Sequence, residues 1–294
     1  MVQRSAGSSA RLLLTLPALA RFAVCLLPAV LGASPTSLAQ HWRDHPPSDF
    51  FLDRWMHFAQ PYETHLPAAD GTPLRMLEIG VSSGGSAIAW KRWYGPSLTY
   101  VGADLNPACK RTESVSDHRF IEIGSQEDPA FLQRLCSKYG PFDIIIDDGA
   151  HIARMVRLSL QLFFESSQCM RDRSIYVIED LHTLARCAGP GHDSTFCNTP
   201  SDFGHLWSEA FLGMHNRWKG CKTGNCDLRR WAKKSPGLGH RDLGPHWASM
   251  VSGIHLYDSI AFLTRSSNQS LSPMQRLMRG NRSDMIKNVD AKLG

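Results

Sequence analysis

Two pairs of acidic residues each follow directly on a short apolar run. Asp147 and Asp148 form the first pair, and Glu179 and Asp180 form the second. His151 lies three residues past the first pair. Open α/β folds build their sites at the carboxyl ends of sheet strands, where we expect these residues to lie. Carboxylates and an imidazole exchange protons or bind cations, so the pattern predicts a functional site at this edge.

A glycine-rich stretch upstream predicts a cofactor site. Residues 76–86, M-L-E-I-G-V-S-S-G-G-S, have the pattern of a strand, a tight turn and the start of a helix. Glycine permits the turn and a close ligand approach, and the helix start offers unpaired N–H groups. Asp104 follows the next expected strand, about two dozen residues after Gly80, a spacing that suits a carboxylate bound to ribose hydroxyls. A NAD site is one candidate, but the run reads E-x-G-x-S-x-G and lacks G-x-G-x-x-G.

The glycine-rich run, with Glu78 before its first glycine, resembles the first motif of class I S-adenosylmethionine methyltransferases. With four further motifs in one order, the chain resembles the magnesium-dependent macrolide-sugar O-methyltransferases of the mycinamicin and tylosin type. The five motifs are E-I-G-V with G-G-S (78–81 and 84–86), G-S-Q-E-D (124–128), F-D-I-I-I-D-D-G-A-H (142–151), I-E-D-L-H-T (178–183) and I-H-L-Y-D-S (254–259). The resemblance covers residues 74–185 and returns at 250–264.

This resemblance implies a magnesium-dependent transfer of a methyl group from S-adenosylmethionine to a sugar hydroxyl. It implies metal binding by Asp148, Glu179 and Asp180, with His151 as the general base. It assigns cofactor binding to Glu78, Gly80, Ser82, Gly84, Ser86, Asp104, Ser125, Gln126 and Asp147. Family versions usually carry Asp at the position of Ser125, so this chain departs from the family at its contact to the adenine amino group.

The implied chemistry is physically consistent. A hard cation that binds an alcohol oxygen lowers the pKa of the alcohol and fixes it in line with the methyl sulfonium. Mg²⁺ prefers oxygen ligands and keeps waters that a substrate diol could replace. An imidazole beside the metal ligands is then placed to accept the hydroxyl proton.

Each of these residues also has a structural interpretation. Asp147 and Asp148 could cap the following helix, since Asp is a favoured N-cap residue. Glu179 and Asp180 could end a strand in solvent. A lone histidine such as His151 is more often structural than catalytic. Gln126 could be a turn residue. Strand alternation points Asp147 away from Asp148, so Asp147 could instead hold a neighbouring loop or the base. The two acidic pairs together, beside a cofactor loop, favour a functional site.

The regular elements alternate along the chain. We expect strands at 75–79, 98–102, 120–123, 142–146 and 175–178, with helices near 86–93, 129–139 and 154–164. This alternation predicts a parallel sheet. The runs 254–257 and 260–264 flank Asp258 and Ser259 and predict a closing antiparallel hairpin. The expected fold class is α/β: a Rossmann-like class I methyltransferase fold with a mostly parallel seven-stranded sheet and helices on both faces.

Length and composition fit one catalytic domain with additions. The chain has 294 residues, of which 43% are hydrophobic. We expect a helical cover at 40–70, the methyltransferase domain at 71–264 with a Cys/His-rich insertion at about 187–243, and a polar tail at 265–294. A net charge of +5 does not suggest nucleic acid. The expected partner is a sugar or small-molecule hydroxyl acceptor, and the oligomeric state stays open.

Residues 1–39 predict a targeting or anchor segment that does not belong to the fold. A basic start, an apolar region and small residues after it resemble a secretory signal or an uncleaved anchor. Arg21 divides the apolar region, so neither half is long enough to span a bilayer. We expect a secretory or secreted protein, with membrane association only through this segment. A transit peptide to an organelle is the alternative, because the segment holds Arg and Ser and no acidic residue occurs before Asp44.

The cysteines bear on the compartment. Three of them lie in the expected core and are predicted to be buried thiols: Cys109, Cys136 and Cys169. Four in the insertion could form two disulfides, with a zinc site or free thiols as alternatives: Cys187, Cys197, Cys221 and Cys226. Glycosylation sequons at Asn268 and Asn281 also fit a secretory route.

Two other functions stay open. A protein of this fold could bind the cofactor without transferring a methyl group if the insertion occluded the site. Cephalosporin-hydroxylase-like oxidative enzymes share the E-I-G-V and G-G-S elements. The D-D-G-x-H motif at 147–151 favours the methyltransferase over the oxidative enzyme.

Overall fold

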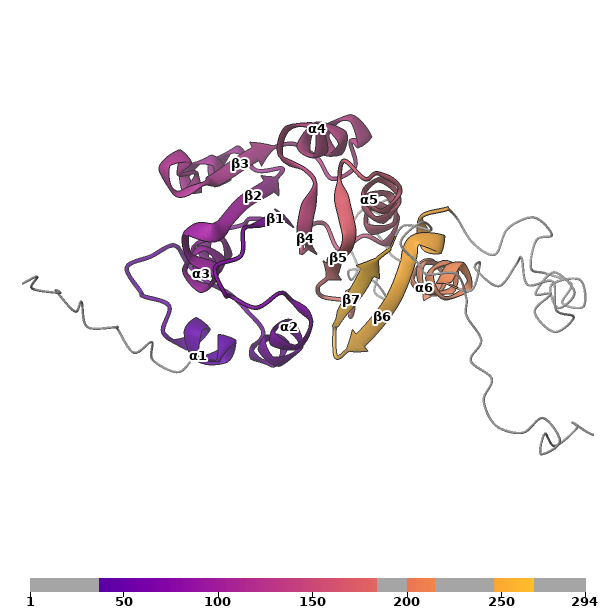
Figure 1. Cartoon of the computed structure of the whole chain (residues 1–294), viewed down its shortest axis with the longest axis horizontal. Coiled ribbons are helices and arrows are strands. Elements are labelled where there is room, and N and C mark those ends of the chain that lie inside the picture. Colours follow the sequence, from indigo (N-terminus) through magenta and orange to yellow (C-terminus); the bar gives the residue numbers. More distant parts are fainter. Residues whose placement is uncertain (1–36, 184–199, 215–245, 267–294) are drawn as a thin grey trace, which may run out of the picture. The chain divides into compact units, whose positions relative to one another are not determined.

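The computed structural model describes residues 37–183, 200–214 and 246–266. Their centre is a seven-stranded sheet with the strand order β3-β2-β1-β4-β5-β7-β6 (Figure 1). The strands are β1 (Leu74–Ile79), β2 (Leu98–Asp104), β3 (Arg119–Ile123), β4 (Phe142–Asp147), β5 (Met170–Ile178), β6 (Val251–Tyr257) and β7 (Ile260–Arg265). The first five are parallel, β7 is antiparallel to β5, and β6 is antiparallel to β7. The predicted mostly parallel sheet with a closing hairpin is confirmed.

The order of the strands reverses at β1, which lies between β2 and β4. In open α/β sheets this reversal leaves a crevice at the carboxyl ends of the strands, where ligands bind. Ile79 of β1 pairs with Asp147 of β4, and Asp147 pairs with Ile178 of β5. The residues that follow these strands therefore emerge side by side at one edge of the sheet.

Helices cover both faces of the sheet. The α-helices are α1 (Leu38–Arg43), α2 (Ala59–His65), α3 (Gly85–Tyr94), α4 (Pro129–Tyr139), α5 (Ala153–Glu165) and α6 (Pro200–Met214). Short 3-10 helices span Met56–Phe58, Gly95–Ser97, Pro107–Thr112, Val115–Asp117 and His246–Met250. Because strand residues alternate between faces, Met76 and Ile144 join the core under α1, α2 and α3, and Leu77 and Ile145 join the core under α4, α5 and α6.

The folded part begins earlier than the sequence predicts. The predicted boundary of the amino-terminal segment is residue 39, but Leu38 opens α1 and is 1% exposed. Ser37 caps this helix by accepting a hydrogen bond from the backbone N–H of Gln40. The correction has a simple cause: an apolar residue at the end of an apolar segment carries no sign that it packs on a distant helix.

Part of the predicted insertion is a helix of the core. Helix α6 lies within 187–243, and its Leu206, Trp207 and Ala210 are buried against the face that α5 covers. Arg157 of α5 and Glu209 of α6 form an ion pair at 2.6 Å. The four cysteines of the insertion lie outside the described residues, as do the two sequons.

Two of the three cysteines predicted to be buried thiols form a disulfide. Cys136 near the end of α4 is joined to Cys169 before β5, with their Cα atoms 4.6 Å apart. The prediction was wrong here because residues 33 apart in sequence meet only in the folded chain. Cys109 is a free buried thiol, as predicted, and burial raises its pKa to about 11. Within the described residues, no helix is both long enough and apolar enough to cross a membrane.

Candidate active site

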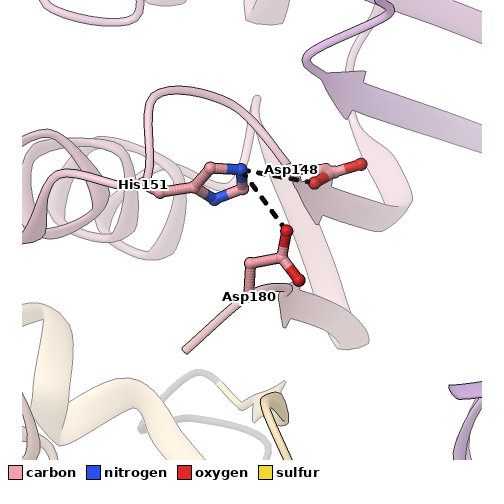
Figure 2. Close-up of side chains that lie close together, drawn as sticks. All are labelled: Asp148, His151 and Asp180. Atoms are coloured by element: carbon pink, nitrogen blue, oxygen red, sulfur yellow. Dashed lines mark ion pairs between the residues drawn. The ribbon is translucent and has the colours of Figure 1, made fainter. Parts of the chain in front are cut away.

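Three of the predicted residues meet at the carboxyl edge of the sheet. Asp148 and His151 lie on the loop after β4, and Asp180 lies on the loop after β5 (Figure 2). The Nε2 atom of His151 is 3.6 Å from Oδ1 of Asp148 and 3.7 Å from Oδ2 of Asp180. One possible ligand atom from each of the three lies within 4.8 Å of the others. The site is therefore built from two sequence motifs, with Asp148 and Asp180 separated by 32 positions (180 − 148).

The loops hold this arrangement through unusual backbone conformations. His151 has φ +52° and Asp180 has φ +53°, in the left-handed region that non-glycine residues rarely adopt. Gly80 after β1 has φ +91°, and a Cβ atom there would lie 2.0 Å from the carbonyl oxygen of Asp148. Only glycine therefore lets the cofactor loop pack against the loop that carries Asp148.

The pair Asp148 and Asp180 fits a divalent metal. Oδ1 of Asp180 is buried and has no hydrogen-bond partner among the described residues. A buried carboxylate oxygen without a partner is unfavourable unless a cation or a donor reaches it. The side chains of Asp148, Asp180 and His151 are each about a quarter exposed, so the site is open to solvent. Carboxylate oxygens of this kind are the ligands that Mg²⁺ prefers.

The third predicted metal ligand, Glu179, lies deeper and is already bound by protein groups. Its side chain is 3% exposed. Nη1 of Arg54 donates to both of its carboxylate oxygens at 2.7 Å, and the Tyr62 hydroxyl donates to Oε1. The structure thus brings Glu179 to the same edge as Asp148 and Asp180 but turns its oxygens toward the amino-terminal cover.

Arg54 is a residue of this site that the sequence analysis missed. Besides Glu179, its Nη1 lies 3.2 Å from Oδ2 of Asp148, and its Nη2 contacts Glu78. Its side chain is 4% exposed. Burial disfavours the charged guanidinium, but Glu179 and Glu78 more than offset this and raise the pKa of Arg54 above its usual range. The available signal was a single basic residue in an aromatic stretch, F-F-L-D-R-W at 50–55.

Burial also changes the acids themselves. It raises the pKa of Asp148 well above its usual range, and the neighbouring charge of Glu179 raises it further. Burial likewise raises the pKa of Glu179, against the lowering effect of Arg54. Negative charges crowded into a partly buried site favour the binding of a cation.

A cavity of about 330 Å³ lies beside this cluster. Four predicted cofactor residues line it: Gly80, Asp104, Ser125 and Gln126. Apolar side chains, among them Leu105, Phe131, Ile152 and Met155, form most of the remaining wall. Oδ2 of Asp104 accepts hydrogen bonds from the backbone N–H groups of Val81 and Ser82 at 2.8 and 3.0 Å. The cavity therefore combines an apolar wall with a carboxylate at the end of β2, which suits a nucleoside.

Other predicted cofactor residues support the cavity from outside. Asp147 is 1% exposed and accepts hydrogen bonds from Gln126 at 2.9 Å and Tyr176 at 2.6 Å. It holds a neighbouring loop, one of the two alternatives that its strand position allowed, and does not line the cavity. Glu78 is fully buried and accepts from Ser86 at 2.7 Å and from Tyr100.

The glycine loop also borders a second cavity. Ser82 lies in the left-handed region with φ +49° and lines a cavity of about 250 Å³ together with Asp104. Gly84 has φ +88°, and a Cβ atom there would lie 2.2 Å from the Thr112 side chain. These two positions therefore shape the turn between β1 and α3.

The turn of the closing hairpin reaches the same edge. Ser259 has φ +63°, its carbonyl oxygen accepts from the Leu181 N–H at 3.0 Å, and its Oγ lies 2.5 Å from Nδ1 of His182. These contacts fix the loop that carries Asp180. The predicted I-H-L-Y-D-S motif at 254–259 therefore contributes to the site through its last residue.

Comparisons with known proteins agree with this geometry. No family model matches the chain. It is 30% identical over 232 residues to the demethylmacrocin O-methyltransferase of Streptomyces fradiae, covering 75% of this chain and 52% of the relative. It is 34% identical over 172 residues to the L-olivosyl-oleandolide 3-O-methyltransferase of Streptomyces antibioticus, covering 53% of this chain and 43% of the relative.

A solved structure extends the likeness to the fold. The MycE methyltransferase of the mycinamycin biosynthetic pathway, in complex with Mg, SAH and mycinamycin VI, matches 80% of this chain and 55% of that chain. The TM-score is 0.57 and the sequence identity is 26%. The chain spans about half the length of the curated relatives that it matches. The resemblance to macrolide-sugar O-methyltransferases and the Rossmann-like fold are both confirmed.

Proposed function

We propose that this chain, which resembles the macrolide-sugar O-methyltransferases over its α/β domain, transfers a methyl group from S-adenosylmethionine to a hydroxyl of a sugar, a glycan or a glycosylated natural product. A divalent metal, Mg²⁺ by its ligand chemistry, assists the transfer. The observation that carries the proposal is the convergence of Asp148, His151 and Asp180 within 4.8 Å beside a nucleoside-sized cavity. One relative is an L-olivosyl-oleandolide 3-O-methyltransferase, and the solved MycE structure is a complex with Mg, SAH and mycinamycin VI.

The acidic pair is suited to hold the metal. When bound, Mg²⁺ would supply a positive charge that acidifies and orients the acceptor hydroxyl. The side chains of Asp148 and Asp180 are partly exposed, and the buried Oδ1 of Asp180 has no hydrogen-bond partner among the described residues. Glu179 already accepts hydrogen bonds from Arg54 and Tyr62, so an ion that it binds competes with these donors.

His151 is suited to accept the proton of the acceptor hydroxyl. Its ring lies between the two aspartates and is 26% exposed, so an acceptor at the metal ligands reaches it from solvent. The strained backbone at this residue keeps the ring at the open side of the site. Transfer of the methyl group from sulfur to oxygen leaves S-adenosylhomocysteine, and the proton passes from the hydroxyl to Nε2 of His151.

The cavity beside the cluster is suited to hold the methyl donor. Asp104 can accept hydrogen bonds from ribose hydroxyls, and the apolar wall with Leu105, Ile152 and Met155 can hold a planar base. Gly80 joins the two parts, because it lines the cavity and touches the loop that carries Asp148. The donor and the acceptor would thus meet on either side of one glycine turn.

Calorimetric titration of the full chain with S-adenosylmethionine, with and without Mg²⁺, tests this proposal. We expect micromolar binding, followed by transfer of labelled methyl from the donor to members of a panel of sugar acceptors. Binding without transfer to any acceptor would favour a cofactor-binding protein of the same fold. A folded chain that does not bind the donor would exclude the methyltransferase function.

The compartment is part of the proposal. The Cys136–Cys169 disulfide supports an oxidising environment, because such bonds are rare in the cytosol. A secretory or secreted enzyme that is a glycoprotein would fit this disulfide, the amino-terminal segment and the two sequons. Mass spectrometry of the chain from its own cells, without reducing agent and before and after glycosidase treatment, would test this. Free thiols at both positions together with the absence of glycans would contradict it.

A further inference from the structure

A buried guanidinium lies among the carboxylates of the site. Arg54 contacts Glu78 on the cofactor side and Glu179 and Asp148 on the metal side. We propose that Arg54 sets the metal affinity of this site: it is the counter-ion of Glu179 and Asp148 in the metal-free chain, and the divalent ion displaces it. The inference rests on the proposed function, because it takes the metal as given.

The hydrogen-bond geometry shows that Arg54 occupies the metal side. A single nitrogen, Nη1, lies 2.7 Å from each oxygen of Glu179 and 3.2 Å from Oδ2 of Asp148. This nitrogen has two hydrogens and faces three oxygens, so part of the attraction is between charges. The oxygens that Arg54 leaves open are Oδ1 of Asp148 and both oxygens of Asp180.

The charges make Arg54 and a divalent ion strong competitors for the same carboxylates. Three carboxylates, those of Glu78, Asp148 and Glu179, face one guanidinium, whose side chain is 4% exposed. Water and salt therefore screen the guanidinium weakly, and a divalent cation beside it is repelled. An ion that binds Asp148 and Glu179 must overcome this repulsion or move the guanidinium away.

The existing contact with Glu78 can hold the guanidinium after it leaves the metal side. Nη2 of Arg54 already contacts Glu78, which is fully buried and lies on β1. Arg54 itself lies between α1 and the 3-10 helix Met56–Phe58, on a segment without regular structure. Its side chain can therefore withdraw toward Glu78 without breaking a hydrogen bond of the sheet. In this state the amino-terminal cover remains attached through Glu78, and Glu179 is released for the ion.

Titration of the full chain with Mn²⁺, followed by electron paramagnetic resonance of the free ion, tests this inference. The variant Arg54→Gln removes the charge and keeps a side chain of similar length. We expect it to bind Mn²⁺ about tenfold more tightly than the wild type, or better, because the repelling charge is gone. Arg43→Gln is the matched control: Arg43 is exposed on α1, so its loss should leave the affinity unchanged.

A second variant protects the test against misfolding. If circular dichroism shows that Arg54→Gln is unfolded, Arg54→Lys keeps the charge but cannot make the same forked contacts. We expect its Mn²⁺ affinity to exceed that of the wild type by a smaller factor. A folded variant that binds Mn²⁺ no better than the wild type overturns the role of Arg54. If neither the wild type nor any variant binds Mn²⁺, the result contradicts the metal dependence in the proposed function itself.

Discussion

At the scale of single residues, the site depends on backbone conformations that most side chains avoid. His151, Asp180, Ser82 and Ser259 all have positive φ, and each costs on the order of 1–3 kcal/mol. Strain of this kind persists only where the surrounding contacts fix it, and it gathers at functional sites. Here it places an imidazole and a carboxylate at the open end of the crevice.

Replacement of His151 tests the general base. In His151→Ala we expect the methyl-transfer rate to fall by about 10²- to 10⁴-fold, because a positioned base contributes that much. Donor affinity should stay within about twofold, since the ring does not line the cavity. His118→Ala is the control, because His118 is exposed, has φ +51° and lies outside the site. A His151→Ala enzyme that is as fast as the wild type would exclude His151 as the general base.

Replacement of Gly80 tests the contact between the two halves of the site. In Gly80→Ala we expect a loss of stability of about 2 kcal/mol or more, with weaker binding of the donor, because the added Cβ meets the Asp148 carbonyl at 2.0 Å. Gly71→Ala separates strain from collision: Gly71 has φ +88°, but nothing lies within 4 Å of its added Cβ. Chemical denaturation measures the loss of stability in each of the two variants. Equal losses in the two variants would show that the collision does not matter.

At the scale of elements, the sheet register decides which side chains meet. Asp147 pairs with Ile79 on one side and Ile178 on the other, so the loops after β1, β4 and β5 begin at one level. The hairpin of β6 and β7 then brings Ser259 against the loop that carries Asp180. The disulfide between Cys136 and Cys169 ties α4 to the start of β5, at the opposite end of these strands from the site.

The disulfide predicts an effect on stability without an effect on the site. In the double variant Cys136→Ser, Cys169→Ser we expect a loss of about 2–4 kcal/mol, because the bond closes a loop of 33 residues. Donor binding should be unchanged under conditions where the variant is folded. Cys109→Ser is the control, since Cys109 forms no disulfide. Urea unfolding of the oxidised chain measures the difference, and equal midpoints for wild type and double variant would contradict the expectation.

At the scale of the whole molecule, two apolar cores on the two faces of the sheet hold the fold together. One core lies under α1, α2 and α3, and the other under α4, α5 and α6. Leu38 and Tyr62 belong to the first core, so the amino-terminal cover is part of the folded body. Arg54 lies on this cover and balances the buried charges of Glu78 and Glu179.

Removal of the metal should therefore separate activity from folding. After treatment with a chelator we expect methyl transfer to stop, while the circular dichroism spectrum stays native. Added Mg²⁺ should restore the rate and raise the melting temperature, with a stabilisation that grows as the logarithm of one plus its concentration over its Kd. The readout is thermal melting with and without the chelator. Unfolding of the chelated chain would mean that the ion, and not Arg54, balances the acids.

The sequence alone predicted the seven strands in order, helices α3, α4 and α5, and the three side chains that meet at the carboxyl edge of the sheet. Apolar alternation and the glycine-rich turn predicted the strands and helices, including α4 at 129–139 with the same bounds. The acidic pairs could be predicted as site residues because they stand at the ends of strands. The strand order of an open α/β sheet then brings such strand ends together. Helix α6 was not predicted, because it lies inside a stretch rich in Gly, His and Cys.

Only the tertiary structure decided the contacts between distant segments. Arg54 is 125 residues from Glu179, and no local pattern relates them. Cys136 and Cys169 were predicted to be separate thiols for the same reason. Asp147 could hold a loop or touch the cofactor until packing placed Gln126 and Tyr176 against it. Sequence periodicity reports which face of an element is buried, whereas pairing between elements depends on how the whole chain packs.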